Sequence, residues 1–360
     1  GPAGGGQPAS GGSTVRIAMD DLAPANTTAV ALNLTITDAA AAGYATAWSC
    51  DRSRPSTSTT NFGTGNVGAG SPTASFSFTA VGASRSVCVF VSATAHVVVD
   101  VFAAFVAGSG AERGLGWRAV GPVRVADTRA GAAAMAAGTV VEVAIPIDRG
   151  AGRSGAAVFV NLTVADAATG GYLTAWSCDQ ARPATSNVNY TGQRSSAGAG
   201  QVPIANAAVV SIGPSGRLCV FASSPAHVVV DLFGVFDAAG TGSFQPAVPT
   251  RILDTRDGTG GWAGSLMSAR AIDVATALAS GTTVVATVTA TDVFGSGFVT
   301  ASTGGVAGRP FVSNLNVVPG STRPNLAVVA LGPDASVRLS VGGNVATTMI
   351  VDVTGWFTPD

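Results

Sequence analysis

The chain has 360 residues, of which 47% are hydrophobic and 11% charged, and its formal net charge at pH 7 is −1. Soluble domains usually contain about 25% charged residues, so this composition describes a weakly charged globular chain and excludes a disordered one. Nineteen basic residues stand against twenty acidic ones. They form no basic stripe, which excludes ordinary nucleic-acid binding through phosphates. We expect no transmembrane helix, because no stretch of about 18 residues is continuously apolar.

One pattern occurs three times along the chain. The phrase VVVDVF at residues 97–102 returns as VVVDLF at 228–233 and as IVDVTGWF at 350–357. Upstream of each copy lies a second shared block, which reads NLTITD, NLTVAD or TVTATD. Repetition at this period predicts three copies of one unit, each with a normal domain size of roughly 110–125 residues.

The boundaries follow from composition. We expect residues 1–12, rich in Gly and Ala, to be a flexible N-terminus or the remnant of a protease cleavage that removed any export signal. The predicted units are residues 13–106 (unit one), 117–237 (unit two) and 244–360 (unit three), joined by Gly/Ala/Ser-rich linkers at 107–116 and 238–243. The sequence leaves open whether the units lie in a row or around a pseudo-threefold axis.

Each unit contains short runs of Val, Thr, Ile and Phe bounded by Gly, Pro, Ser, Asn and Asp, which is typical of an all-β chain. In unit two we expect strands at residues 124–126, 140–145, 157–164, 173–177, 187–190, 207–212, 218–222 and 227–236. Eight short strands favour a β-sandwich or jelly roll. The last strand is apolar on both faces apart from Asp231. This pattern predicts a central strand whose lone carboxylate has a partner.

An arginine is the expected partner of that carboxylate. The segment VADTR at residues 125–129 returns as ILDTR at 252–256 at the head of unit three, whereas unit one has no such element before its first strand. Because arginine binds carboxylates in a bidentate manner, we expect Arg129 to pair with Asp231 and Arg256 with Asp352. The alternative is that Asp127 and Arg129 only cap a surface turn.

The four cysteines occur as two pairs. Cys50 and Cys88 of unit one match Cys178 and Cys219 of unit two, and unit three lacks both cysteines. Joint loss is typical of a disulfide and not of small buried hydrophobes, so we expect the bonds Cys50–Cys88 and Cys178–Cys219. Each should contribute roughly 3–4 kcal/mol and requires an oxidising compartment. Zinc is the alternative, but the short ligand spacing is missing.

Polar and aromatic side chains provide the candidate ligand-binding residues. Asparagine is unusual in strands, and alternation places two amides on one face, where they bind a sugar or join a turn to the neighbouring unit. Trp48 and Trp176 either stack on carbohydrate or cover the adjacent disulfides. The ladder residues considered for sugar binding are Asn187, Asn189, Tyr190, Asn314 and Asn316.

The repeats resemble a module common in secreted actinobacterial proteins, with the pattern DTR, NLT, GYLT-W, RP-SN-N and VDV-GYF. Unit two matches best, unit three retains most of the motifs, and unit one is degraded. In unit two the matching residues are Arg124, Asp127, Thr128, Arg129, Asn161, Gly171, Tyr172, Leu173, Thr174, Trp176, Arg182, Pro183, Ser186, Asn187, Asn189, Asn206 and Asp231. The resemblance implies tandem β-sandwiches and secretion, and it implies no catalytic activity.

Catalytic chemistry has few candidates. His96 and His227 precede the repeated aspartates Asp100 and Asp231 by four residues, about 13 Å along a strand, which is too far for a triad hydrogen bond. Aspartates present in every copy favour a role in the fold over one active site, although a glycan-active hydrolase would need two of them across a cleft. We expect no cofactor and no metal site.

These observations predict a secreted, non-catalytic surface or accessory binding protein, for glycan, a cell-envelope component or a partner protein. The near-neutral composition favours recognition by hydrogen bonds and stacking. The alternatives are a structural, self-assembling envelope or spacer protein, and a glycan-active hydrolase. Disulfides place the protein outside the cytoplasm.

Overall fold

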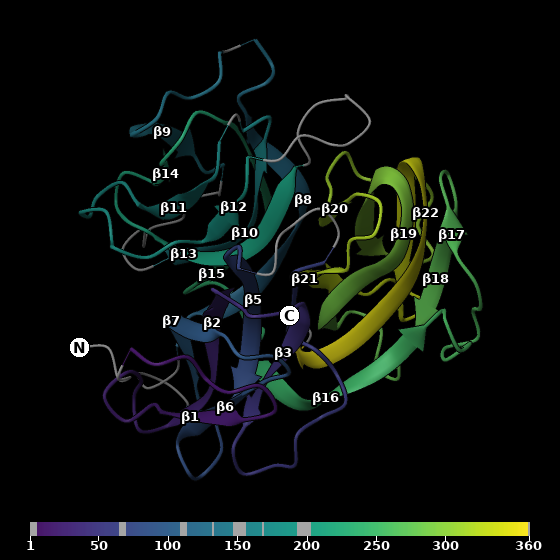
Figure 1. The fold of residues 1–360 in the computed structure, drawn as a ribbon, viewed down its shortest axis with the longest axis horizontal. Helices are drawn as coiled ribbons and strands as arrows, with labels where there is room; N and C mark the ends of the chain where they lie inside the picture. The colour runs from purple at the N-terminus through teal and green to yellow at the C-terminus, as the bar shows by residue number, and fades with distance from the viewer. Residues whose placement is uncertain are drawn as a thin grey trace.

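A computed structural model describes residues 6–64, 70–108, 114–131, 133–146, 156–167, 169–192 and 203–358. Every regular element in these ranges is a β-strand, and all the pairings are antiparallel. The protein is therefore all-β, with three successive sandwich units (Figure 1).

Unit one consists of two facing sheets around its own core. One sheet has the order β1-β6-β3-β4 and the other β5-β2-β7. The inward side chains Leu32, Leu34 and Val89 are fully buried between them. The strands are β1 (Thr14–Ala18), β2 (Thr27–Thr37), β3 (Gly43–Ser49), β4 (Thr60–Phe62), β5 (Thr73–Ala80), β6 (Ser86–Val91) and β7 (His96–Val106).

Unit two repeats this plan with one additional strand. Its sheets are β12-β11-β14-β9 and β13-β10-β15-β8, so β15 lies between β10 and β8 as a central strand, as its apolar pattern predicts. The strands are β8 (Gly116–Asp127), β9 (Thr139–Ala144), β10 (Ala156–Ala165), β11 (Gly171–Ser177), β12 (Val188–Tyr190), β13 (Ile204–Ile212), β14 (Arg217–Ala222) and β15 (His227–Asp237).

In unit three two long strands pass through both sheets. β19 covers the positions of β10 and β11, and β22 those of β14 and β15, with a register shift between Thr291 and Phe294 where β19 bends. The strands are β16 (Phe244–Asp254), β17 (Leu266–Met267), β18 (Ala271–Ala275), β19 (Thr283–Thr303), β20 (Leu315–Val317), β21 (Arg323–Ala330) and β22 (Ser336–Phe357).

The repeated aspartate of the NLT-x-x-D block lies at this bend in every unit. Asp38, Asp166 and Asp292 all have positive φ, between 48° and 51°. Aspartate tolerates this left-handed conformation better than most residues. The motif therefore turns the chain toward the second sheet, after the end of a strand in units one and two and at the bend within β19 in unit three, which is a structural role.

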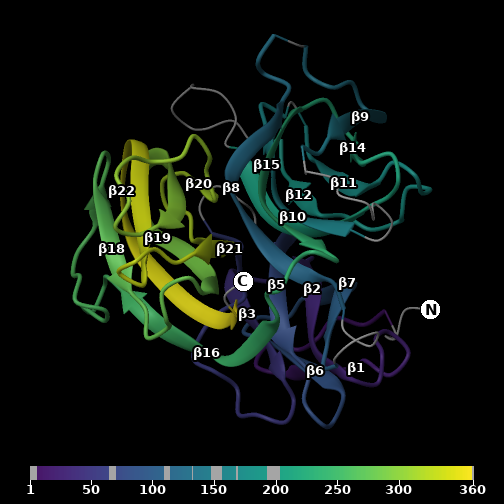
Figure 2. The same ribbon diagram turned by 180° about the vertical axis from the view of Figure 1, so that it is seen from behind.

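The three units pack around a common axis. The strands β5, β13 and β21, one from each unit, contact one another, and Figures 1 and 2 show the units grouped around them. Phe78 of unit one, Phe159 of unit two and Phe357 of unit three belong to one shared aromatic cluster in which Phe78 contacts both other rings. The sequence left this arrangement open, and the structure has the pseudo-threefold form.

The N-terminal segment is more regular than expected. Ala9 forms a bridge with Ala95, and the Gly11 amide donates to Thr94 Oγ1 at 3.0 Å. Residues 6–12 are thus joined to unit one, while residues 1–5 of the expected flexible segment lie outside the described residues.

Candidate functional site: a cleft between units one and three

The arginine of the DTR motif does not pair with the buried aspartate. Arg124 instead forms the fork, with Nε and Nη2 at 2.9 and 3.2 Å from the two Asp231 oxygens. Arg129 pairs with Asp127 at 2.7 Å. The prediction of Arg129–Asp231 is therefore wrong. Arg124 lies directly opposite Asp231 in the β8–β15 register, whereas Arg129 follows the end of β8.

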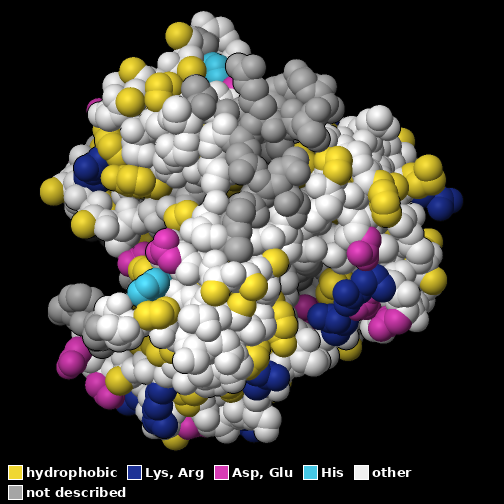
Figure 3. All heavy atoms as spheres, in the orientation of Figure 1, with side chains coloured by type: hydrophobic (Ala, Val, Ile, Leu, Met, Phe, Trp, Pro, Cys, Tyr) yellow, Lys and Arg dark blue, Asp and Glu magenta, His cyan; other side chains and the backbone are white. Residues whose placement is uncertain are grey.

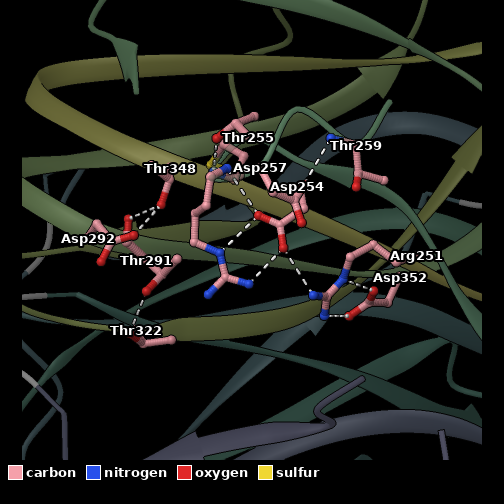
Figure 4. Close-up of polar contacts among 12 residues, drawn as sticks. Arg251, Asp254, Thr255, Asp257, Thr259, Thr291, Asp292, Thr322, Thr348 and Asp352 are labelled. Atoms are coloured by element: carbon pink, nitrogen blue, oxygen red, sulfur yellow. Dashed lines mark hydrogen bonds and ion pairs between the residues drawn. The ribbon is translucent and has the colours of Figure 1, made fainter. Parts of the chain in front are cut away.

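Unit three has the same arrangement, so the prediction of Arg256–Asp352 is wrong as well. Arg251 forks to Asp352 at 2.9 and 3.2 Å, and its third nitrogen reaches Asp254 at 3.0 Å. Asp254 also binds Arg256 at 2.7 Å. Figure 4 shows the resulting chain of alternating charges from the DTR turn to β22.

Burial and hydrogen bonds shift the pKa values of the aspartates in this series of ion pairs. The pKa of Asp352 is raised by desolvation, which the hydrogen bonds from Arg251 oppose. Hydrogen bonds from Arg256 lower the pKa of Asp254. The threonine of the motif adds a second attachment, because the Met349 amide donates to Thr255 Oγ1 at 2.9 Å. We call the R-x-x-D-T-R element with these contacts the arginine clamp.

The disulfides have the expected pairing, Cys50–Cys88 and Cys178–Cys219. Trp48 lies opposite Cys88 in the strand register, as Trp176 lies opposite Cys219. The two indoles are only 7% and 9% exposed. Their N–H groups donate to main-chain oxygens four residues later, at 2.9 and 3.0 Å. Trp176 is therefore a structural side chain beside its disulfide. Trp48 is packed in the same way but also lines the cleft between units one and three, so only the prediction of fully exposed sugar platforms is wrong.

The asparagine ladder joins neighbouring units. Asn33 of unit one donates to Ser186 O of unit two at 2.8 Å and accepts from Asn206 Nδ2 at 2.9 Å. The Phe76 amide of unit one donates to Asn206 Oδ1 at 2.9 Å. Asn187, which is 1% exposed, accepts from the Ala175 amide.

The interface between units two and three repeats these bonds. Asn161 donates to Ser313 O at 2.7 Å, and Asn325 Nδ2 donates to Asn161 Oδ1 at 2.8 Å. Asn314 is 2% exposed and accepts from Ala301 N. Asn187 and Asn314 thus support the structural alternative, and exposed sugar binding by them is contradicted.

The remaining predicted ligand residues are also engaged within the fold. Tyr190 is 4% exposed and hydrogen-bonds with Ser224. Asn189 is half-buried and donates to Ser186 Oγ, and Asn316 accepts from Ser313 Oγ. None of the three presents a fully exposed side chain for sugar stacking or hydrogen bonding.

The third interface, between units one and three, lacks the asparagine ladder. Thr287, Ser75 and Thr59 of this interface replace the asparagines of the other two. Ser75 Oγ is buried without a hydrogen-bond partner among the described residues. The Leu326 amide, which would donate across this interface, instead donates to Asn325 Oδ1 of its own unit at 2.9 Å.

A cleft of about 500 Å³ occupies this interface. The strand β16 of unit three forms one wall through residues 246–249, with the sequence PAVP, and the loop 51–59 of unit one lies across from it. Asp352 lines the cleft but is 1% exposed and held by Arg251, so its charge is compensated. Ten hydroxyl side chains line the same cleft: Thr28, Ser49, Ser53, Thr57, Ser58, Thr59, Ser77, Thr79, Thr287 and Thr354.

Sequence reasoning missed the role of the repeated Arg-Pro dipeptide. Arg54 and Arg182 stack on Phe90 and Phe221, with Cζ 3.7 Å from each ring centroid. Cation–π contacts of this kind are favourable by about 0.5–2 kcal/mol. They anchor the loop after β3 or β11 to the sheet below, and in unit one that loop is a wall of the cleft. The recurrence of Arg-Pro with an aromatic in every unit was the available signal.

The surface has little charge outside a few clusters. Most of the face in Figure 3 is uncharged, and the arginine and acidic side chains gather in a few groups where the two signs lie side by side. Among the described residues, no group of three His, Cys, Asp or Glu side chains forms a metal-binding cluster. No helix within the described ranges has the length and apolar character needed to span a membrane.

Comparisons with known proteins identify no family. No protein-family description matches the chain, and no curated protein matches its sequence. Two solved viral structures each match over 96% of this chain. One is described as the atomic structure of Sulfolobus Turreted Icosahedral Virus, and the other as the triple jelly roll fold and turret assembly in an archaeal virus. They cover 83% and 82% of the viral chains, at 8% and 9% identity and TM-scores of 0.19 and 0.18.

A third structure is the CBM22-1-CBM22-2 tandem domain of Paenibacillus barcinonensis Xyn10C, matched over 66% of this chain and 92% of that chain. Its identity is 12% and its TM-score 0.19. Scores this low indicate no ligand or activity for this protein.

Proposed function

We propose that this protein is a secreted, non-catalytic binding protein whose cleft between units one and three holds a neutral, polyhydroxylated ligand of the glycan class. The observation that supports this proposal is the break in pseudo-symmetry. Two interfaces are closed by buried asparagines, and the third has short hydroxyl side chains and an open cleft.

The lining of the cleft suits such a ligand. Ten hydroxyls provide donors and acceptors, while Pro246, Val248 and Pro249 offer apolar surface to sugar C–H groups. The single buried carboxylate, Asp352, is neutralised by Arg251. A second carboxylate, Asp51, lies in the same lining, and hydrogen bonds from Ser84 lower its pKa. With Asp352 held by Arg251 and Asp51 favoured in its ionised form, the described lining of the cleft has no free carboxyl group to act as the general acid of glycoside hydrolysis, which favours binding.

The proposed location outside the cytoplasm rests on the two disulfides, because such bonds persist in oxidising compartments. Membership in the secreted actinobacterial repeat family that the motifs resemble remains part of this proposal. A self-assembling envelope subunit is the second candidate, and one open sheet edge of unit one favours it.

A glycan array followed by titration calorimetry tests the binding site. We expect saturable binding of at least one neutral glycan. Val248→Trp, which adds a ring at a 51% exposed position on the cleft wall, should weaken binding by about tenfold or more by occupying the site. Val140→Trp, at a 47% exposed position outside the cleft lining, is the matched control and should leave affinity unchanged. Equal effects of the two variants, or no binding by folded protein, would contradict the proposal.

A further inference from the structure

The last strand of unit one differs from its counterparts in its surroundings. β15 lies between β10 and β8, and β22 pairs with β19 and β16, whereas β7 pairs with β2 alone among the described strands. Ten residues of β7 are half-buried and Val98 is 44% exposed, although the equivalent part of β15 is buried almost throughout. The second edge of β7 therefore presents unpaired backbone groups beside apolar side chains.

The carboxylate of Asp100 on β7 also lacks a partner among the described residues. Asp100 occupies the position of Asp231 and Asp352, opposite Asn33 in the β2 register. It has no hydrogen-bond or ion-pair partner in the part of the chain that the structure describes. Desolvation raises the pKa of Asp100, and no arginine opposes this effect. A half-buried carboxylate without a partner is unfavourable, and a guanidinium fork would relieve that cost.

The other two units show what covers this edge. In both, an antiparallel strand adds to it and places an arginine directly opposite the aspartate, Arg124 on Asp231 and Arg251 on Asp352. The threonine four residues after that arginine then accepts from a main-chain amide at the start of the last strand, as Thr128 Oγ1 does from Val228 N at 2.9 Å. Main-chain ladder bonds and one charged fork together specify the added strand.

One residue sets a limit on the strand that fits β7. Gly234 and Gly355 lie beneath the aromatic ring that begins the added strand, and a Cβ on either would come within 2.6 Å of Trp117 or Phe244. Unit one has Ala103 at this position. A strand for unit one must therefore lack the leading aromatic ring.

We propose that the open edge of β7 binds, by strand addition, an extended segment of another polypeptide that carries the R-x-x-D-T-R pattern without a leading aromatic residue. The arginine of that segment forks to Asp100, its backbone pairs with residues 97–104, and its threonine caps the start of β7. This would make unit one the point at which the protein joins a partner chain.

The probe is a synthetic peptide of residues 119–130, AVGPVRVADTRA, added to the protein and followed by fluorescence anisotropy. We expect saturable binding with a dissociation constant on the order of 1–100 µM, as is usual for strand addition by short peptides. Hydrogen exchange of the 97–104 amides should slow on binding. Asp100→Asn, or a peptide with Arg124→Gln, should weaken binding by about tenfold, because either change removes the charged fork.

Ala103 provides a second test. The longer peptide 117–130, which includes Trp117, should bind the natural protein no better than the short one, and Ala103→Gly should improve its binding selectively. Asp21→Asn, at an exposed aspartate of the same unit outside β7, is the control. The inference is overturned by absence of saturation up to about 1 mM, or by binding that Asp100→Asn leaves unchanged. Either result leaves the proposed ligand cleft untouched, because that site contains Asp352 and not Asp100.

Discussion

At the scale of single residues, the two arginines of each clamp have different roles. Arg124 contacts both a fully buried carboxylate and Asp127, and 23% of its side chain is exposed. Arg129 contacts only Asp127 and its side chain is 42% exposed. Removing a partner from a buried charge is costly because the remaining charge is left without compensation, whereas exposed pairs contribute little.

We therefore predict unequal effects for matched substitutions. Arg124→Gln should lower the free energy of unfolding by about 3–5 kcal/mol, and Arg129→Gln by about 1 kcal/mol or less. Urea unfolding of unit two, followed by hydrogen exchange of β8 and β15, measures the difference. Equal losses would show that Arg124 does not hold Asp231 in solution.

Acid should weaken the clamp in a defined range. Hydrogen bonds from Arg129, together with its charge, lower the pKa of Asp127 to about 2. A lowered folded-state pKa means that its stabilising contribution is complete above the unfolded value of about 4 and is lost as pH falls through 2. We expect Asp127→Asn to abolish about 1–2 kcal/mol of this acid-sensitive stability. Urea midpoints between pH 5 and pH 2 test it, and parallel pH profiles for the two proteins would contradict it.

Asp100 should behave in the opposite way. Its raised pKa means that the ionised form destabilises the folded state above the folded pKa, and that this penalty disappears as pH falls toward the unfolded value. We expect Asp100→Asn to raise the thermal midpoint at pH 7 and to leave it unchanged near pH 3. Differential scanning calorimetry at both pH values measures this, and a lower midpoint at pH 7 would indicate a partner for Asp100 within the chain.

At the scale of elements, each disulfide joins the end of one strand to the strand paired beside it. Cys50 follows β3 and Cys88 lies within β6, at a sequence separation of 38 residues. Closing a loop of this length contributes about 4 kcal/mol through the unfolded state in the chain-entropy estimate. Unit three does without a bridge, and there β19 and β22 run uninterrupted through both sheets.

The paired substitution Cys50→Ser with Cys88→Ser should therefore destabilise unit one by about 3–4 kcal/mol. Unit three should be much less affected, because each unit has its own sandwich core and the cluster that the two units share is the central aromatic one. Hydrogen exchange of β2 and β19 distinguishes these outcomes. Equal loss of protection in both units would mean that the units unfold together.

At the scale of the whole molecule, buried asparagines close two of the interfaces between units, whereas the interface between units one and three contains the open cleft. The buried asparagines satisfy one another across units that are 150 or more residues apart in sequence. Satisfied buried polar networks favour a single arrangement. In this network Asn187 Nδ2 has no partner among the described residues, while its Oδ1 accepts from the Ala175 amide. Among the described residues, the third interface has a smaller polar contact, in which the Thr322 amide donates to Thr64 Oγ1 at 3.0 Å and that hydroxyl donates to Thr322 O at 3.1 Å.

Restoring the ladder should close the cleft. In Thr287→Asn with Ser75→Asn, the two amides can reproduce the Asn161–Asn325 bond of the neighbouring interface. We expect a gain of about 1 kcal/mol in the free energy of unfolding, as for one buried hydrogen bond, and loss of glycan binding. Calorimetry and the array measure both, and unchanged glycan affinity in a stabilised variant would place the ligand elsewhere.

The sequence by itself determined the features that arise within one unit. Strand patterns, the Cys50–Cys88 and Cys178–Cys219 bonds and an arginine partner for Asp231 and Asp352 all follow from residues whose spacing recurs in at least two copies. The sequence pattern of one copy predicts these features because each copy folds around its own core.

Only the tertiary structure decided which arginine forms the fork, because a strand register with shifts places Arg124, and not Arg129, opposite Asp231. It also decided the burial of Asn187 and Trp176, the cleft beside Thr287 and the open edge at Asp100. These depend on contacts between units far apart in the chain. The replacement of asparagine by Thr287 is visible in the sequence, but its consequence requires knowing that units one and three meet.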